Sequence, residues 1–237
     1  MDGSGLSLPA DLEGAQAGFW VAVDKPLTWT SFDVVAKVRN ALKRRYGARV
    51  KIGHAGTLDP LATGLLVLAV GRKTKEIEAV MAGAKTYVAT LKLGAVTDSC
   101  DAETPEKLTG APVPELTAEL EAELRAQFTG VVQQVPPLFS AVKVDGARAY
   151  DLARSGKTAE LSARPVTIES LEFEALDAAH WQLRIRCGKG TYIRSLARDL
   201  GDYLGCGAYL TQLRRTEVAP FTEMHSVDAV LAAIQSS

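Results

Sequence analysis

Two neighbouring segments of the chain, residues 165–176 and 181–187, alternate apolar and polar side chains with a period of two residues. A strand places successive side chains on opposite faces, so that Trp181, Leu183 and Ile185 are expected to share one face. This alternation is typical of an antiparallel sheet with one buried and one solvated face, and not of a parallel sheet that is buried on both sides. The fold is therefore predicted to contain a half-buried antiparallel sheet.

Helical segments interrupt the predicted strands at irregular intervals. Ser31 is a candidate N-cap of a helix whose apolar face is predicted from four residues at helical spacing: Phe32, Val35, Val38 and Leu42. Further helices are expected after Gly190 and after Ser226. This order favours an α+β fold with a mixed, largely antiparallel sheet flanked by helices. Residues 1–17 show no periodicity and are predicted to be a flexible tail, which leaves 18–237 as one domain.

The distribution of charge is more informative than its sum, since the net charge is −1 and the sequence pI is about 6.3. The segment 43–51 carries five basic residues and no acidic one, and acidic residues gather instead at 98–123. A nearly neutral protein with such segregation can present a basic face to a nucleic acid. The alternative is that these charges are ordinary solvated helix faces.

The sequence has no feature of a membrane, secreted or metal-binding protein. No apolar run approaches the ~20 residues that span a bilayer, and the N-terminus lacks the regions of a signal peptide. Cys100, Cys187 and Cys206 are odd in number and do not have metal-ligand spacing. We therefore expect a cytoplasmic protein with no bound metal and no membrane association.

One aspartate, Asp59, lies in an unusual setting within the stretch GHAGTLDPLATGLLVLAVGRKTK. Pro60 favours an extended backbone at the residue before it. Gly53, Gly56 and Gly64 allow sharp turns and close approach of other backbone. An aspartate before proline is more often structural than catalytic, but this stretch predicts a loop that holds one carboxylate in front of a buried strand.

A catalytic carboxylate needs a partner that keeps it ionised and oriented. Arg194 is a candidate because it lies off the core stripe of its helix, although a surface arginine with a solvated head is the alternative. The three histidines lie in unrelated contexts, and the glycines match neither a dinucleotide fingerprint nor a phosphate loop. One carboxylate with several cations and aromatic residues suits a nucleophile that acts on a flipped-out base.

Five stretches in the same order resemble the TruB family of tRNA pseudouridine synthases, which modify uridine 55 in the T-loop. They are VDKPLTWTSFDVVAKVR, the Asp59 stretch, KTYVATLKLGAVTDSCDAE, VPPLFSAVKVDGARAYDLARSG and CGKGTYIRSLARDLGDYLGCGAYLTQLRRTEV. The match spans roughly residues 19–225. The resemblance implies the pseudouridine synthase fold with a central cleft, a tRNA substrate recognised through its T-arm, and no cofactor.

The resemblance also implies roles for single residues. Asp59 matches the nucleophile, and Arg194 matches the arginine that pairs with it. Tyr87 matches the tyrosine that stacks on the target uracil and is a candidate for moving its C5 proton. Tyr192 matches a residue of the same pocket, and Leu213 matches an apolar wall against the uracil.

Basic residues complete the expected site. His54 matches a histidine that helps to hold the T-loop around the flipped base. Lys25 and Lys75 match lysines near the site. Lys43, Arg44 and Arg45, in the basic segment before the catalytic loop, are expected to contact tRNA phosphates rather than bases.

Two departures from the family pattern bear on these expectations. Phe139 stands where the motif PPxYSAxK usually has tyrosine, which removes one hydroxyl. The sequence also ends near residue 237, where many relatives continue into a C-terminal RNA-binding PUA domain. The chain is therefore either a short form without that domain or a shortened piece of a longer protein. We also expect a monomer.

Two other functions fit part of the pattern. A non-catalytic module that remodels tRNA would share the basic segments, but it gives no reason for pairing Asp59 with Arg194. A carboxylate hydrolase acting on nucleosides or glycans would usually need a second carboxylate near the first, and the Asp59 stretch has none.

Overall fold

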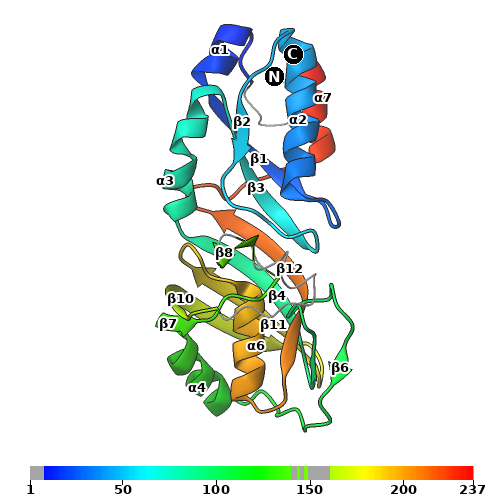
Figure 1. Cartoon of the computed structure of the whole chain (residues 1–237), viewed down its shortest axis with the longest axis vertical. Helices are drawn as coiled ribbons and strands as arrows, with labels where there is room; N and C mark the ends of the chain where they lie inside the picture. Colours follow the sequence, from blue (N-terminus) through cyan, green and yellow to red (C-terminus); the bar gives the residue numbers. More distant parts are fainter. Residues whose placement is uncertain (1–7, 140–142, 145–146, 149–160, 237) are drawn as a thin grey trace. The chain divides into compact units, whose positions relative to one another are not determined.

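A computed structural model describes residues 8–139, 143–144, 147–148 and 161–236 of the chain (Figure 1). The chain divides into two compact units, which we call unit 1 (Met1–Thr86 with Arg214–Ser237) and unit 2 (Tyr87–Leu213). Both boundaries lie within strands, the first in β4 (Lys85–Leu93) and the second in β12 (Ala208–Val218). Unit 2 is therefore one continuous segment inserted into unit 1.

The sheet of unit 1 is built around a strand that is buried along almost its whole length. Its strands include β1 (Phe19–Lys25), β2 (Ile52–His54), β3 (Ala62–Val70) and β13 (His225–Ser226). β1 and β2 both pair antiparallel with β3, and β13 pairs in parallel with β1. The apolar run 65–70 of β3 is fully buried, as a strand covered on both faces requires.

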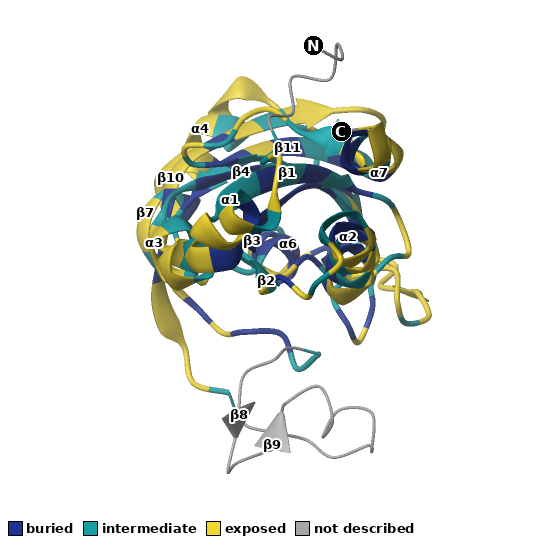
Figure 2. Cartoon of the chain, turned by 90° about the horizontal axis from the view of Figure 1, so that it is seen from above, coloured by how far each residue is buried: buried dark blue, intermediate teal, exposed yellow. Residues whose placement is uncertain are grey.

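Unit 1 has several helices. They are α1 (Leu12–Ala17), α2 (Ser31–Tyr46), the 3-10 helix η1 (Gly71–Glu76), α3 (Ile77–Ala82) and α7 (Val227–Ser236). Of these, α2 and α7 bury apolar faces in the core of the unit. Val34, Val38 and Leu42 of α2 share a core with Val230 and Ile234 of α7. The exposed and buried sides of the helices are distinguished in Figure 2. The core of unit 1 thus depends on segments from both ends of the chain.

The structure corrects two expectations for α2. Thr30, not Ser31, is its N-cap: the Thr30 side chain accepts a hydrogen bond from Asp33 N, and the Asp33 carboxylate accepts one from Thr30 N at 2.8 Å. Phe32, expected on the apolar face, is 63% exposed. It lies about 200° around the helix from Val34, a central residue of the buried face.

The N-terminal segment is also more ordered than its composition predicted. Residues 12–17 form α1, and the Asp11 carboxylate caps it by accepting a hydrogen bond from Gly14 N at 2.8 Å. Ala15 is buried in the core of unit 1. The flexible-tail prediction is therefore wrong for residues 12–17, because a helix of six residues is too short to show periodicity in sequence.

Unit 2 has strands and helices of its own. In addition to β4 and β12, its elements are β5 (Ala95–Val96), β6 (Lys107–Leu108), β7 (Gly130–Gln134), β8 (Lys143–Val144), β9 (Ala147–Arg148), β10 (Arg164–Ala175), β11 (His180–Cys187), α4 (Ala118–Phe128) and α6 (Ile193–Tyr203). Its main strand order is β12-β4-β11-β10-β7. The pairs β10–β11 and β10–β7 are antiparallel.

The alternating segments of the sequence form the β10–β11 pair of unit 2. Leu183 lies opposite Phe173, Ile185 lies opposite Leu171, and Trp181, Leu183 and Ile185 are all buried. α6 is largely buried as well, and its side chains join the same core (Figure 2). The predicted fold class, a mixed and largely antiparallel sheet flanked by helices, is confirmed.

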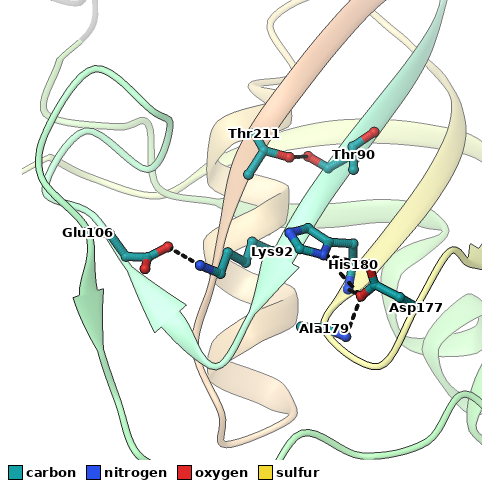
Figure 3. A network of polar contacts seen from close by, with 7 residues as sticks. All are labelled: Thr90, Lys92, Glu106, Asp177, Ala179, His180 and Thr211. Atoms are coloured by element: carbon teal, nitrogen blue, oxygen red, sulfur yellow. Dashed lines mark hydrogen bonds and ion pairs between the residues drawn. The ribbon is translucent and has the colours of Figure 1, made fainter.

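Polar contacts fix the turn between β10 and β11. Asp177 Oδ1 accepts hydrogen bonds from Ala179 N and His180 N, each at 2.8 Å (Figure 3). The His180 ring lies 3.0 Å from the same carboxylate. On β4, Lys92 forms an ion pair with Glu106 at 2.6 Å. His180, the first residue of β11, thus binds the carboxylate of the turn, in keeping with its exclusion from the catalytic candidates.

Candidate active site

Asp59 lies half-buried in the loop between β2 and β3. The segment that joins β1 to α2 fixes the residues on both sides of it. The Ser31 hydroxyl accepts a hydrogen bond from Leu58 N at 2.9 Å and donates one to Leu58 O at 3.1 Å. On the other side, Pro60 O accepts a hydrogen bond from Thr28 N at 2.9 Å. The backbone that carries the carboxylate is held immediately before and after it.

Lys25 adds a buried link to the same loop. Its side chain is 0% exposed, and Nζ donates to two carbonyls of the β1–α2 connection at 2.6 and 3.0 Å and to Pro60 O at 3.3 Å. Burial lowers the pKa of Lys25 to about 8, while the negative charge of Asp59 opposes the shift. The ammonium is therefore mainly protonated at neutral pH, and it supplies a positive charge beside the loop.

Arg215 of β12 joins the two ends of the Asp59 loop. Its side chain is 1% exposed, Nη2 donates to Gly56 O at 3.0 Å and Nε donates to Leu65 O at 2.8 Å. Gly56 has a φ of +104°, and a Cβ added at Gly64 would lie 2.2 Å from Arg215 O. The glycines around Asp59 are therefore needed because the loop must turn sharply and pack directly on β12.

His54 is the last residue of β2, and the positive charge of Arg215 acts on its imidazole. Burial and the positive charge of Arg215 lower the pKa of His54. Its Nδ1 is buried and has no hydrogen-bond partner among the residues that the structure describes. The imidazole is therefore neutral at pH 7, the form in which one ring nitrogen donates and the other accepts.

Arg194 is held in the first turn of α6. It is 6% exposed and forms a buried ion pair with Asp101, with Nη1 3.4 Å from Oδ2. Its guanidinium also donates to Phe139 O at 2.9 Å and to Ser99 O at 3.4 Å. Sequence reasoning did not identify Asp101 as a partner, and the pairing of Arg194 with Asp59 stays a prediction.

A main-chain contact shows one consequence of having phenylalanine at position 139, where the family motif usually has tyrosine. Arg194 binds the carbonyl of Phe139, and a carbonyl is present whichever side chain the residue carries. This contact therefore does not depend on the missing tyrosine hydroxyl.

A glutamine fixes the start of α6 next to Tyr192. The buried Gln134 accepts a hydrogen bond from Tyr192 N at 2.8 Å and donates one to Tyr192 O at 3.1 Å. Ser195 Oγ donates to Val135 O at 2.8 Å. Tyr192, Tyr87 and Leu213 are each half-buried, and Tyr87 and Leu213 pack against the core of unit 2.

The predicted phosphate-binding residues differ in their surroundings. Lys43 and Arg44 are exposed in the last turn of α2, and Lys75 is exposed in η1. Arg45 instead donates to Ile234 O at 3.1 Å and to Pro9 O at 3.0 Å. These two main-chain acceptors hold Nη1 and Nη2 of Arg45 within unit 1, and the phosphate-binding role of Arg45 stays a prediction.

The profile described as TruB family pseudouridylate synthase (N terminal domain) matches residues 43–193, which is more than half of the chain. The chain belongs to the TruB family. A second profile, tRNA pseudouridylate synthase B C-terminal domain, matches residues 194–236. The resemblance carried by the five sequence stretches is confirmed, and the chain is a pseudouridine synthase. Membership of this enzyme family argues against both alternative functions, a non-catalytic module that remodels tRNA and a carboxylate hydrolase.

Curated relatives are similar over most of their length. The tRNA pseudouridine synthase B of Phocaeicola vulgatus is 50% identical over 196 residues, which are 82% of this chain and 83% of the relative. That of Bacteroides thetaiotaomicron is 51% identical over 200 residues, with the same coverage of each chain. That of Cereibacter sphaeroides is 49% identical over 210 residues, which are 88% of this chain and 67% of the relative.

Solved structures agree with the fold of this TruB family member. The crystal structure of a Cbf5-Nop10-Gar1 complex contains a chain with a TM-score of 0.67 and 29% identity. The similarity covers 90% of this chain and 54% of that one, so this chain spans about half the length of its solved neighbour. In the described part of this chain, no helix has the length and apolar character of a membrane span.

Sequence reasoning missed four residues that position the predicted site: Ser31 as a loop anchor, Arg215, Asp101 and Gln134. Arg215 lies two residues after Leu213 within a recognised stretch, so its basic side chain in a buried strand was the available signal. The others are contacts between distant segments, for which a single sequence carries no signal.

Proposed function

We propose that this enzyme converts uridine 55 in the T-loop of tRNA to pseudouridine, with Asp59 as the nucleophile. The observation that carries the proposal is the immobilised Asp59 loop: Ser31 and Thr28 bind the neighbours of the carboxylate, and Arg215 bridges the ends of the loop. A nucleophile gains most when its geometry is fixed before the substrate arrives. Relatives about 50% identical carry the name tRNA pseudouridine synthase B, which supports the substrate class.

The reaction is an isomerisation in which one bond to the sugar replaces another. The N1–C1′ bond breaks, uracil rotates, and a C5–C1′ bond forms; N1 gains a proton and C5 loses one. As the nucleophile, the Asp59 carboxylate forms a C–O bond to one of the two electrophilic carbons, C1′ or C6, and this bond is broken again by the end of the reaction, so that the carboxylate is regenerated. Removal of the C2′ proton by Asp59 is the alternative to this attack. Arg194 orients the carboxylate, and Tyr87 stacks on uracil and moves the C5 proton. The electrons balance without an oxidant or reductant.

Recognition of the T-arm is proposed to combine a base pocket with phosphate contacts. Extruding the target base costs a few kcal/mol of unstacking, and stacking on an aromatic ring such as Tyr87 returns about 1–3 kcal/mol. Tyr192 and Leu213 enclose the uracil, and neutral His54 hydrogen-bonds the folded loop of the RNA. Lys43, Arg44 and Lys75 are exposed and are proposed to contact phosphates.

The test is to incubate a T-arm stem-loop with wild type and with Asp59→Asn, and to measure pseudouridine by nucleoside chromatography of the digested RNA. The amide preserves shape, so we expect binding within a few fold of wild type and no product. Asp98→Asn is the matched control, because Asp98 forms an exposed ion pair with Lys107. Turnover by Asp59→Asn would contradict the nucleophile assignment, and no product from wild type would contradict the function.

A further inference from the structure

A depression of about 260 Å³ lies on unit 1 at the C-terminal half of α2 and the segment that follows it. It is lined by Arg39, Asn40, Lys43, Arg49 and Val50. Val50 is 6% exposed and belongs to the hydrophobic core of the unit, so it anchors the depression to packed structure. The other lining residues supply two guanidinium groups, one ammonium and one amide.

The cations of this depression have no anionic partner within the described part of the chain. No hydrogen bond or ion pair joins Arg39, Lys43 or Arg49 to another described residue. Arg39 Cζ lies 5.7 Å from the centre of the Phe32 ring, a cation–π contact that is neither an ion pair nor a hydrogen bond. The arrangement therefore presents unpaired donors.

Neighbouring acids do not neutralise the depression. Asp33, on the same helix, binds the Thr30 backbone and hydroxyl at the other end of α2. α7, which packs against α2, contributes Asp228 in its own first turn. The sequence from 34 to 58 contains no aspartate or glutamate.

The dipole of α2 accounts for only part of this positive charge. Cations in the last turn of a helix are stabilised by the partial negative charge of the unpaired carbonyls, and Lys43 lies in that turn. Arg39 lies one turn earlier, and Arg49 lies beyond the Gly47 that ends the helix. Their convergence on one depression points instead to an external anion.

We propose that Arg39, Lys43 and Arg49 form a binding site for one backbone phosphate of the RNA substrate, distinct from the Asp59 loop. The proposal rests on the proposed function, which supplies the RNA. A guanidinium can bind two phosphate oxygens at once, and an ammonium adds a point charge. Asn40 is placed to donate a further, uncharged hydrogen bond. Three cations around one small depression bind one phosphate in common, not three separately.

The experiment measures the affinity for a T-arm stem-loop across a range of salt concentrations, using Arg39→Gln, Arg49→Gln and the double variant. Losing one phosphate contact makes the dependence of log affinity on log salt shallower by ~0.7–0.9. The double variant should change by this amount and not by twice it, since both arginines bind the same phosphate. The two single effects on log affinity should accordingly be non-additive.

The matched control is Lys37→Gln with Arg72→Gln, which removes two exposed charges outside the depression. We expect this control to keep the wild-type slope. In the double variant, KM should rise while kcat at saturating RNA is unchanged, because the site does not touch the reacting base. At constant ionic strength, inorganic phosphate should compete with RNA for binding to the wild-type protein. The same phosphate concentration should not weaken RNA binding to the double variant.

A double variant with the slope of the control would overturn the proposal, and so would equal competition by inorganic phosphate in wild type and double variant. In both cases wild type would still form pseudouridine. The proposed function fails on a different observation, namely wild type that binds the stem-loop but makes no pseudouridine.

Discussion

Arg215 brings a positive charge into a part of unit 1 that solvent does not reach, and main-chain carbonyls accept its hydrogen bonds. The two acceptors, Gly56 O and Leu65 O, lie on opposite sides of Asp59 in the chain. A planar guanidinium can donate in two directions with fixed geometry, which a lysine ammonium cannot reproduce. Arg215 therefore determines the width of the Asp59 loop, although we place it outside the reacting atoms.

Replacing Arg215 tests this positioning role. Arg215→Lys leaves one buried carbonyl without a donor, so we expect the free energy of unfolding to fall by about 1–3 kcal/mol. If Asp59 is the nucleophile, as proposed, we expect kcat to fall about 10- to 100-fold with little change in KM, because small displacements of a nucleophile cost rate more than binding. Urea unfolding and single-turnover kinetics measure the two effects.

The adjacent Arg214 is the control for that prediction. Its guanidinium binds the Asp24 carboxylate through two partly exposed contacts of 2.8 and 3.1 Å. Arg214→Lys should keep wild-type kcat and lose at most about 1 kcal/mol of stability. Equal loss of kcat in the two variants would show that Arg215 has no special relation to the loop.

His54 predicts a dependence of stability on pH. Its pKa is lowered by burial and by Arg215, whereas the unfolded chain has the ordinary value of 6.5. As pH falls below 6.5, the unfolded state takes up a proton that the folded state resists, so stability is lost toward the folded pKa. Wild type should therefore lose more free energy of unfolding than His54→Gln between roughly pH 7.5 and pH 5.5. Parallel losses in the two proteins would contradict the assignment.

Among the elements, α6 shows most clearly how a helix is tied to the sheet beside it. Gly201 faces the start of β12, and a Cβ there would lie 2.0 Å from Ala208 N. In a helix interior, alanine is about 1 kcal/mol more favourable than glycine. The added methyl group would be forced against the backbone of β12, which costs about 3 kcal/mol of stability. Gly201→Ala should therefore destabilise the protein by about 2 kcal/mol net.

Thermal and urea unfolding measure this effect, with Asp202→Ala as the control on the exposed side of the same helix. The control should stay within about 0.5 kcal/mol of wild type. An unchanged or more stable Gly201→Ala would mean that α6 can move away from β12 at little cost.

Local patterns predicted the elements well, and distant contacts explain what they missed. The alternation at Trp181, Leu183 and Ile185 identified β11 because a strand's period is contained in a few neighbouring residues. The anchoring of Leu58 by Ser31 joins residues 27 positions apart, and Gly56 and Arg215 are 159 apart. Such pairings depend on the folded topology. The Asp59 motif therefore predicted that the loop positions a carboxylate, but it did not show that Ser31 and Arg215 bind the loop.

The basic segment 43–51 also shows that sequence alone does not reveal contacts between distant segments, even for residues within one helical turn. In sequence, Lys43, Arg44 and Arg45 are equivalent charges on an amphipathic helix. In the fold, Arg45 faces the end of α7 and the segment around Pro9, whereas Lys43 lines the depression with Arg39 and Arg49. Which cations remain available to RNA depended on elements far away in the chain.

At the scale of the whole molecule, each unit has a hydrophobic core of its own. The core of unit 2 draws only on residues within 87–213, and the cores of unit 1 draw only on segments outside that range. The boundary between the two family profiles, after residue 193, lies instead at the first residue of α6. That boundary would separate Leu196 and Leu200 from the core of unit 2.

Fragments of the chain should therefore behave differently. Residues 87–213 retain the complete core of unit 2, so we expect a cooperative urea transition and a near-ultraviolet circular dichroism signal from Trp181. Residues 1–193 lack α6 from one core and α7 from the other, and we expect no cooperative transition. A folded 1–193 fragment would show that the profile boundary, and not the division of cores, separates independently stable parts.

The insertion of unit 2 into unit 1 also has a consequence during translation. Domains usually fold in the order in which the ribosome releases them, from the N-terminus onward. Here residues 1–86 emerge first but lack Arg215 and α7, which are encoded after all of unit 2. The inserted unit is therefore free to fold before the segment that precedes it. A nascent chain therefore carries the Asp59 loop early and acquires Arg215, which bridges the ends of that loop, only near the end of synthesis.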